Sequence, residues 1–287
     1  MAATTQAPRS AGYKPSRAKR AQLWIANHFA AISAILVLAY MFLPIVYTFI
    51  FSFNDHGKTN IVWQGFTLEH WADPCGVAGA CSSLVTSLQI GAVSTVVATV
   101  LGTMMALAMV RYQFRGKAAS NLLVFVPMAT PEIVLGASLL TIFVQGFSGL
   151  GLELGFWTIT AAHIMFCLSF VVVTVRARIQ SLDPRIEEAA QDLYASPQAT
   201  FWRVTFPLIL PGVLGAAMLA FSLSFDDFII TNFVSGNEST FPKFVYVSAK
   251  RGIPAEANVI GISMFVIAIA LVVGGTLLSS LRTKKGA

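Results

Sequence analysis

The chain has 287 residues, of which 56% are hydrophobic and only 11% are charged, against about 45–50% and about 25% in an average soluble domain. So few polar side chains cannot cover the surface of a water-soluble particle of this size, which excludes an ordinary soluble enzyme. The formal net charge of +6 fits either a nucleic-acid-binding protein or a membrane protein with basic cytoplasmic segments, and the positions of the basic residues decide between these classes.

Six apolar stretches are long enough to cross a bilayer, which takes about 20 residues. They are separated by polar segments and lie at residues 28–53, 84–110, 122–147, 156–175, 208–234 and 259–281. The sequence therefore predicts an all-α membrane protein with six transmembrane helices. The first stretch is not a cleaved signal peptide, because it is too long and carries Phe49, Phe51 and Phe53 where small residues are expected.

The basic residues gather on one side of these stretches. Residues 1–26 form a basic tail that we expect to be disordered, and residues 282–287 form a second basic tail. Of the 19 basic residues, all except Lys58, Lys243, Lys250 and Arg251 lie on the same side as both tails. The positive-inside rule then places both termini in the cytoplasm, with residues 27–281 as the transmembrane domain of a multi-pass protein of the cytoplasmic membrane. Nucleic acid is not needed to explain the charge.

Cysteine and histidine are too sparse for a metal site. Cys75 and Cys81 lie in the first outer loop, where they could either form a small disulfide or remain free. The four histidines are isolated, without the spacing that metal ligands need. No nucleophile and base are paired in a known motif, so we expect no catalytic residue and no metal.

Small residues recur every fourth position along the second stretch. They are Ser87, Gly91, Thr95, Thr99 and Thr103. Residues at this spacing share one face of a helix. The pattern favours close packing against another helix, and a hydroxyl-lined pathway is the alternative interpretation.

The third stretch contains a carboxylate and two prolines. Glu132 lies about 12 residues, or about 18 Å, into the stretch and so near the membrane midplane. A charge there costs about 2.5–3.5 kcal/mol even on the lenient insertion scale. Pro127 and Pro131 free backbone groups that are tolerated where they face protein or a wet cavity. We therefore expect Glu132 to line a pathway.

The longest cytoplasmic connection, residues 176–206, is predicted to form two short helices. Asp183 with Pro184, and Ser196 with Pro197, are N-cap and first-turn signals, and Pro207 is expected to open the fifth span. Leu182, Ile186, Ala189 and Leu193 share one face of the first short helix, and the loop alone is too short to bury this apolar stripe. We expect a cytoplasmic protein to cover it, and a solvated amphipathic loop is the alternative.

Asp226 and Asp227 lie near the outer end of the fifth span, where neighbouring helical residues point about 100° apart. No Lys or Arg inside any span can neutralise the buried carboxylates. A cationic cargo can, helped by the aromatic faces of Phe225, Phe228 and Trp157. The alternative is that the two aspartates cap helix ends and bind nothing.

The connection at 176–206 also resembles the EAA loop of permease subunits in ABC importers. The matching residues are Glu188, Ala189, Ala190, Asp192, Leu193, Ala195 and Pro207. The resemblance implies that this loop docks into a groove of an ATPase subunit, with Glu188 as a principal contact, and transmits the closure of the ATPase to the membrane helices. The family usually has glycine where this chain has Tyr194, at a turn that is expected to need a left-handed backbone, which costs a non-glycine residue about 1–2 kcal/mol.

Further segments are similar to the spermidine/putrescine permeases of PotC type. They read RYQFRGK at 111–117, LGFW at 154–157, FSLSFDDF at 221–228 and FVSG at 233–236, and the similarity covers about residues 43–285. The resemblance implies the MetI-like fold of type I importers, and a chain that forms half of a polyamine pathway and binds no cofactor.

The implied partners are a second, PotB-like permease, an ATPase dimer that uses ATP and Mg, an extracytoplasmic substrate-binding protein and membrane lipid. An ABC permease for ferric iron or a phosphonate is the first alternative. A secondary transporter is the second, and the EAA-like loop and the lack of an inverted repeat argue against it.

Overall fold

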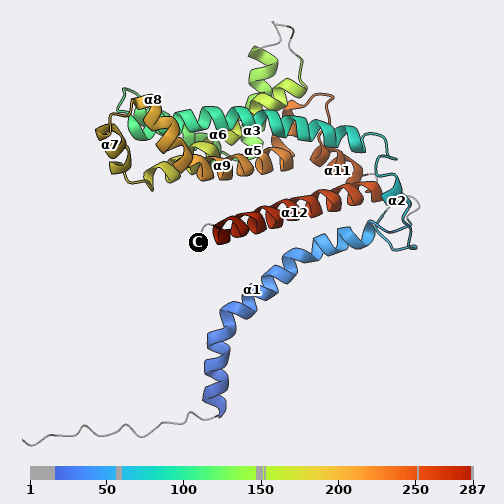
Figure 1. Cartoon of the computed structure of the whole chain (residues 1–287). Helices are drawn as coiled ribbons and strands as arrows, with labels where there is room; N and C mark the ends of the chain where they lie inside the picture. Colours follow the sequence, from blue (N-terminus) through green and yellow to red (C-terminus); the bar gives the residue numbers. More distant parts are fainter. Residues whose placement is uncertain (1–16, 56–59, 147–150, 152, 251, 286–287) are drawn as a thin grey trace, which may run out of the picture. The chain divides into compact units, whose positions relative to one another are not determined.

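The computed structural model describes residues 17–55, 60–146, 151, 153–250 and 252–285, without the side chains of 17–27 and 276–285. In these residues the regular structure is helical, apart from one isolated bridge between Asn54 and Phe66. The chain divides into two units, one made of residues 1–53 and 258–287 and the other of residues 54–257. Figure 1 labels the helices.

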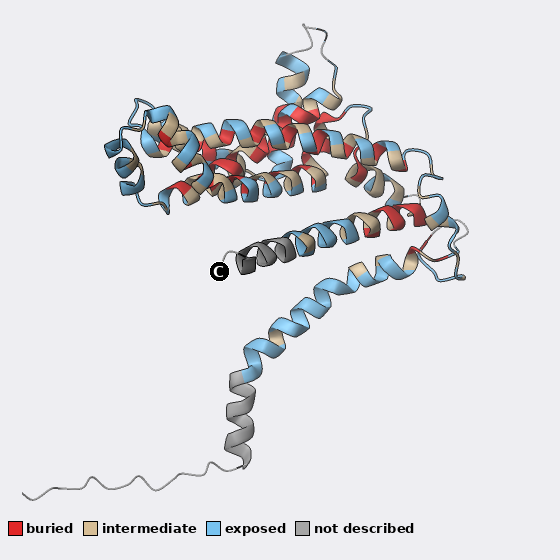
Figure 2. Cartoon of the chain, viewed as in Figure 1, coloured by how far each residue is buried: buried red, intermediate tan, exposed pale blue. Residues whose placement is uncertain are grey.

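The first unit contains α1 (Arg17–Phe51) and most of α12 (Ala255–Lys285). Because α1 begins at Arg17, residues 17–26 are helical, and the expectation of disorder up to residue 26 is wrong for this part; residues 1–16 lie outside the described residues. The segment His28–Phe51 exposes its apolar side chains along its length, as Figure 2 shows. Such a surface is suited to lipid or to another apolar helix.

The second unit is built around three long helices, α3 (Ala80–Arg111), α6 (Phe156–Gln180) and α9 (Phe206–Asp226), which pack against one another (Figure 1). Small residues allow the close approach. A Cβ atom on Gly102 would lie only 2.6 Å from Val171 Cγ1, so α3 and α6 meet there with nothing between them. The core is therefore closely packed around small side chains, as is usual for membrane helices.

The buried row of α3 differs from the expected one. Ser87 and Gly91 are buried, but Thr95, Thr99 and Thr103 are only half-buried, and the buried row continues through Ser94, Ala98, Gly102 and Ala106. A strict four-residue spacing rotates about 40° per step around a helix of 3.6 residues per turn. The expected ridge is thus fully buried at its first two members, while Thr95, Thr99 and Thr103 lie beside the buried row with their hydroxyl oxygens shielded from solvent.

The third predicted span is bent rather than straight. It consists of α4 (Lys117–Ala129), α5 (Glu132–Thr141) and a short π-helix, η1 (Ile142–Gly146), and the two halves meet at 109°. Thr130 and Pro131 have extended backbone angles at the bend. The residue before a proline disfavours the helical conformation, which explains why the helix stops here. Five helices, plus this bent pair as a sixth, are long and apolar enough to cross a membrane in the described residues.

The fifth predicted span is wrong at both ends. A continuous helical segment runs from Pro197 to Asp226 through α8 (Pro197–Thr200), a π-helix, η3 (Phe201–Thr205), and α9. Pro207 therefore lies inside this helical segment, two residues after the end of the π-helix η3. At the other end the helix stops at Asp226, Asp227 is extended, and the separate helix α10 (Ile229–Val234) follows.

The connection that starts at Asn54 is held by specific bonds. Asn54 is buried, and its side chain donates to Asn60 Oδ1 at 2.7 Å and accepts from the Gln64 N–H at 2.8 Å. Helix α2 (Glu69–Ala72) follows, and Cys75 and Cys81 are joined by a disulfide before α3 begins. Another short helix, α11 (Phe241–Ala249), packs on α3.

Candidate functional site

The three acidic residues predicted for the pathway line one cavity. Its volume is about 400 Å³, and Glu132, Asp226, Asp227 and Phe228 lie in its wall with Phe166. Glu132 is the first residue of α5 after the bend, and Asp226 and Asp227 lie at the end of α9. The two interruptions of the helices therefore bring together carboxylates that are almost a hundred positions apart in the sequence.

Helices α5 and α10 pack closely enough to hold these two interruptions side by side. Gly136 of α5 makes this possible, because a Cβ atom there would lie 2.6 Å from Phe233 Cδ2 of α10. An alanine at position 136 would clash with the side chain of Phe233, which would have to move. The glycine is thus part of what positions Glu132 opposite the end of α9.

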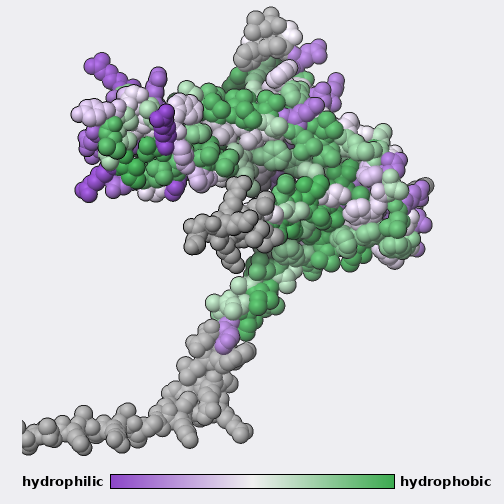
Figure 3. All heavy atoms as spheres, in the orientation of Figure 1, coloured by the Kyte–Doolittle hydropathy of each residue, from purple (hydrophilic) through white to green (hydrophobic). Residues whose placement is uncertain are grey.

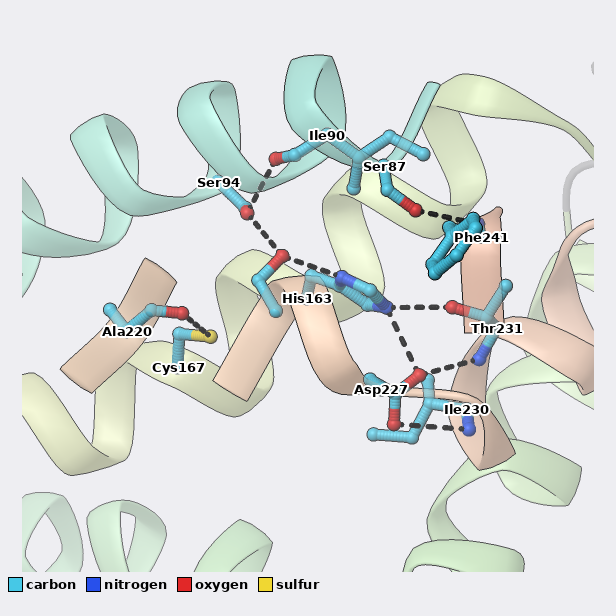
Figure 4. Close-up of polar contacts among 11 residues, drawn as sticks. Ser87, Ile90, Ser94, His163, Cys167, Ala220, Asp227, Ile230, Thr231 and Phe241 are labelled. Atoms are coloured by element: carbon cyan, nitrogen blue, oxygen red, sulfur yellow. Dashed lines mark hydrogen bonds and ion pairs between the residues drawn. The ribbon is translucent and has the colours of Figure 1, made fainter. Parts of the chain in front are cut away.

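Asp227 has a structural role that its two neighbours in the cavity do not share. Its carboxylate accepts hydrogen bonds from the backbone N–H groups of Thr231, at 2.8 Å, and Ile230, at 3.4 Å, and so caps α10. It also contacts His163 Nε2 at 3.2 Å (Figure 4). The helix-capping alternative therefore describes Asp227, which is buried.

Glu132 and Asp226, by contrast, are exposed to the cavity. Within the described part of the chain, neither carboxylate has a hydrogen-bonding or ionic partner. Uncompensated carboxylates in a membrane protein attract a cation or a donor from outside the chain. These two side chains are thus the free negative groups of the site.

A buried polar network stands behind the cavity (Figure 4). His163 of α6 bonds Ser224 Oγ through Nδ1 at 2.8 Å and contacts Thr231 Oγ1 and Asp227 through Nε2. Ser224 in turn contacts Ser94 Oγ of α3 at 2.8 Å. One imidazole therefore links the three long helices and α10, which fixes Asp227 relative to the core.

His163 was not predicted as part of the site, because the histidines are isolated in the sequence and form no cluster. A better signal is available, since any ionisable residue deep in an apolar span needs a partner. His163 lies two turns into α6, and an acidic residue in another span is the natural partner.

Two predicted aromatic contacts lie elsewhere. Phe225 stacks on Phe221, with ring centroids 5.9 Å apart. Trp157 is 73% exposed and lines a different cavity, together with Phe143, Phe156 and Glu153. Of the three aromatic residues expected beside the carboxylates, only Phe228 lines their cavity.

The EAA-like loop forms a short exposed helix, α7 (Arg185–Asp192), between α6 and α8. The predicted capping side chains are bonded: Asp183 Oδ1 accepts the Arg185 N–H at 3.0 Å at the start of α7, and Ser196 Oγ accepts the Ala199 N–H at 3.3 Å at the start of α8. No residue of α7 is buried. In the second unit, hydrophilic side chains gather over α7 and α8 (Figure 3), so this end of the unit is suited to an aqueous interface.

The residues matched to the EAA motif are mostly open to solvent. Glu188, Ala189 and Asp192 are exposed, Leu193 is 82% exposed, and Ala190 and Ala195 are half-buried. Glu187, which the motif does not include, instead bonds Arg111 and Thr205. Two adjacent glutamates thus face different surroundings, one open and one bonded to the helix bundle.

Tyr194 has the left-handed backbone that the sequence predicts, with φ of 61°, and it is the one described non-glycine residue with positive φ. Its side chain is 99% exposed, so it contributes no packing to offset the strain. We expect Tyr194→Gly to raise the free energy of unfolding by about 1 kcal/mol. Thermal unfolding of the purified protein measures this, with Tyr194→Ala as the control that loses the ring but keeps the strain. Equal stability of the two variants contradicts the prediction.

These features together define a class: a helical membrane transport component with internal carboxylates and a separate exposed docking helix. Residues 98–283 match the family described as the binding-protein-dependent transport system inner membrane component. The chain belongs to this family, which makes it a multi-pass protein of the inner membrane. It is the non-catalytic, cofactor-free component of a transporter whose ATP hydrolysis belongs to a separate subunit.

Curated relatives cover most of the chain. The spermidine/putrescine transport system permease protein PotC of Escherichia coli (strain K12) is 35% identical over 249 residues, which is 86% of this chain and 92% of the relative. PotC of Haemophilus influenzae is 35% identical over 87% of this chain and 94% of its own length. The putrescine transport system permease protein PotI of E. coli K12 is 36% identical over 78% of this chain and 82% of its own length. The resemblance predicted from the sequence is thus confirmed.

Solved structures show the same fold at low identity. A chain of a bacterial ABC transporter that imports the acidic polysaccharide alginate matches with a TM-score of 0.67 and 17% identity, over 91% of this chain and 98% of that one. A chain of the MetNI methionine ABC transporter in inward-facing conformations matches with a TM-score of 0.56 and 15% identity, over 69% of this chain and 94% of that one. The prediction of an all-helical, MetI-like permease fold is confirmed.

Proposed function

We propose that this chain is the permease subunit of an ABC importer for polyamines, the class that includes spermidine and putrescine, and that it forms half of the translocation pathway beside a second, PotB-like permease. The observation that carries the proposal is the cavity lined by Glu132, Asp226 and Asp227. The names of the PotC and PotI relatives, at 35–36% identity, support the same cargo.

The chemistry of the cavity suits a flexible polycation. Two carboxylates, Glu132 and Asp226, lack partners in the described chain, and each can accept hydrogen bonds from an ammonium group. The faces of Phe228 and Phe166 line the same space and can contact an ammonium or its methylene chain. An anionic cargo such as a phosphonate would meet repulsion from three acidic residues in the same cavity.

The orientation we propose follows from the distribution of charge. The end of the second unit that carries α7 faces the cytoplasm, as do both termini, because most basic residues lie on that side. The disulfide between Cys75 and Cys81 then lies on the outer side, where oxidising conditions favour it. An extracytoplasmic binding protein delivers the cargo to that side.

The proposed coupling to the ATPase dimer, which uses ATP and Mg, runs through α7. Glu188, Asp192 and Leu193 are exposed there, and Ala189, Ala190, Ala195 and Pro207 complete the matched set. A short helix with no buried residue, followed directly by the exposed apolar side chain of Leu193, needs a partner to cover it. The exposed carboxylate of Glu188 supplies a specific polar contact to that partner.

The test is transport by the reconstituted complex. The chain is placed in vesicles with its second permease and ATPase, the binding protein is added, and uptake of labelled putrescine and spermidine is measured with and without ATP. We expect saturable uptake that requires ATP and the binding protein. Uptake of ferric iron or a phosphonate instead, or polyamine uptake that is driven by an ion gradient without ATP, contradicts the proposal.

A further inference from the structure

Helix α7 has few connections to the helix bundle. It packs on α8 and η3, and short segments join it to α6 and α8. Its polar bonds to other elements, among the described residues, come from a single side chain, Glu187. One oxygen of this residue, Oε1, accepts from Arg111 Nη2 and, at 2.7 Å, from Thr205 Oγ1. We call these three residues the Glu187 clasp.

The clasp joins the same two helices that meet again beside the carboxylate cavity. Arg111 is the last residue of α3, and Thr205 directly precedes α9. Ser94 of α3 and Ser224 of α9 are in contact at 2.8 Å, about 25 Å and about 28 Å along their helices from the clasp. Ser224 leads through His163 to Asp227.

The clasp is better shielded from water than an ordinary surface ion pair. The side chains of Arg111 and Glu187 are 28% and 20% exposed, and Thr205 is buried. Partial burial strengthens the attraction between opposite charges, and the two donors hold the carboxylate in one place. A cationic side chain at the last turn of α3 is also favoured by the dipole of that helix.

Packing alone does not tie α7 to α3. A cavity of about 350 Å³ lies beside the clasp, lined by Leu107 and Arg111 of α3, Gln191 of α7 and Thr200 of α8. Without a bond between the two helices, α7 would be free to move into this cavity without moving α3. The Glu187 clasp is the bond that crosses it, whereas α3 and α9 are long helices in a close-packed core that move as stiff bodies.

We propose that Glu187 is a positioning residue that transmits the movement of α7 to α3 and α9, and through them to the carboxylate cavity. This inference rests on the proposed function, in which the ATPase binds α7 through Glu188. The two adjacent glutamates then have different roles: Glu188 contacts the ATPase outside the chain, and Glu187 bonds to the helix bundle through Arg111 and Thr205.

The test compares two measurements on the same reconstituted vesicles: ATP hydrolysis stimulated by the loaded binding protein, and uptake of labelled putrescine. In Glu187→Gln and in Arg111→Gln we expect stimulated hydrolysis close to that of the unmodified complex but reduced uptake. The ATP used per putrescine should rise about fivefold or more, the lower range of measured coupling between sites.

Two further variants make the result specific to the clasp. Exchanging the charges, with Arg111→Glu and Glu187→Arg in one chain, should bring the ratio back toward that of the unmodified complex. Gln191→Ala, which alters the wall of the same cavity outside the clasp, should leave the ratio unchanged. If Glu187→Gln fails to assemble, the charge-exchanged chain is compared with Arg111→Gln instead. A ratio of ATP to putrescine that is as high in the charge-exchanged chain as in Arg111→Gln contradicts the proposal.

Several outcomes overturn the proposal. One is an unchanged ratio in Glu187→Gln and Arg111→Gln. Another is an equal fall of hydrolysis and uptake in proportion to the amount of assembled complex, which indicates a structural role only. Failure of the docking proposal is distinguishable, because it appears as normal stimulated hydrolysis in Glu188→Lys, whatever the ratio measured for Glu187.

Discussion

Glu132→Gln and Asp226→Asn should each reduce ATP-dependent polyamine uptake by about tenfold to a hundredfold, while the amount of assembled complex stays the same. A hydrogen bond to a charged group contributes about 1.5–3 kcal/mol, and both substitutions keep the shape of the side chain but remove its charge. Both carboxylates are exposed to the cavity, so their loss leaves no buried group unpaired. The initial rate of uptake of labelled spermidine measures the effect.

Glu153→Gln is the matched control for this experiment, because Glu153 lines the separate cavity that contains Trp157. We expect its uptake to be close to normal. Normal uptake in both Glu132→Gln and Asp226→Asn shows that the cavity does not carry the cargo.

Asp227→Asn should behave differently from its neighbour. Its carboxylate is buried, caps α10 and contacts His163, so the substitution disturbs folding as well as the cavity. We expect a lower yield of assembled complex, which separates the structural carboxylate from the two that face the cavity.

The sequence predicts the membrane helices well because hydrocarbon imposes a simple requirement for length and apolarity. It predicts their interruptions less well. Pro131 was recognisable as a break, but not as a bend of 109°, because the angle depends on how α5 packs against α10. The end of α9 at Asp226 carries neither proline nor glycine, and the break there is stabilised by bonds to His163 and Thr231 that come from tertiary structure.

The same distinction holds for the site. Glu132, Asp226 and Asp227 stand out in the sequence, because a carboxylate in an apolar span is costly and needs a reason. Their convergence on one cavity depends on two helix breaks and on the glycine at position 136, none of which follows from periodicity. Trp157 was expected beside them from its aromatic chemistry alone, and its position at another cavity shows that composition does not determine proximity.

In the EAA-like loop, local signals were more informative. The caps at Asp183 and Ser196 and the left-handed turn at Tyr194 depend on neighbouring residues only, and the structure contains all three. The bonds of Glu187 to Arg111 and Thr205 join segments that are 76 and 18 residues away, and no local pattern indicates them.

Glu188→Lys should abolish most of the ATP hydrolysis that the loaded binding protein stimulates, by about tenfold or more, and should reduce uptake to the same extent. The carboxylate of Glu188 is exposed on α7 and has no partner in the described chain, so its substitution removes no internal contact. Reversal of its charge replaces an attraction in the docking interface by a repulsion, which costs several kcal/mol where the partner group is desolvated.

Gln198→Ala, at an exposed position on the neighbouring helix α8, is the matched control for Glu188→Lys, and a complex with this variant should hydrolyse ATP normally. Because α7 is retained in the variant, co-purification of the ATPase separates weakened docking from misfolding: the ATPase should dissociate more readily in Glu188→Lys, while the two permease subunits stay together. Stimulated hydrolysis at the normal rate in this variant contradicts a docking role for α7.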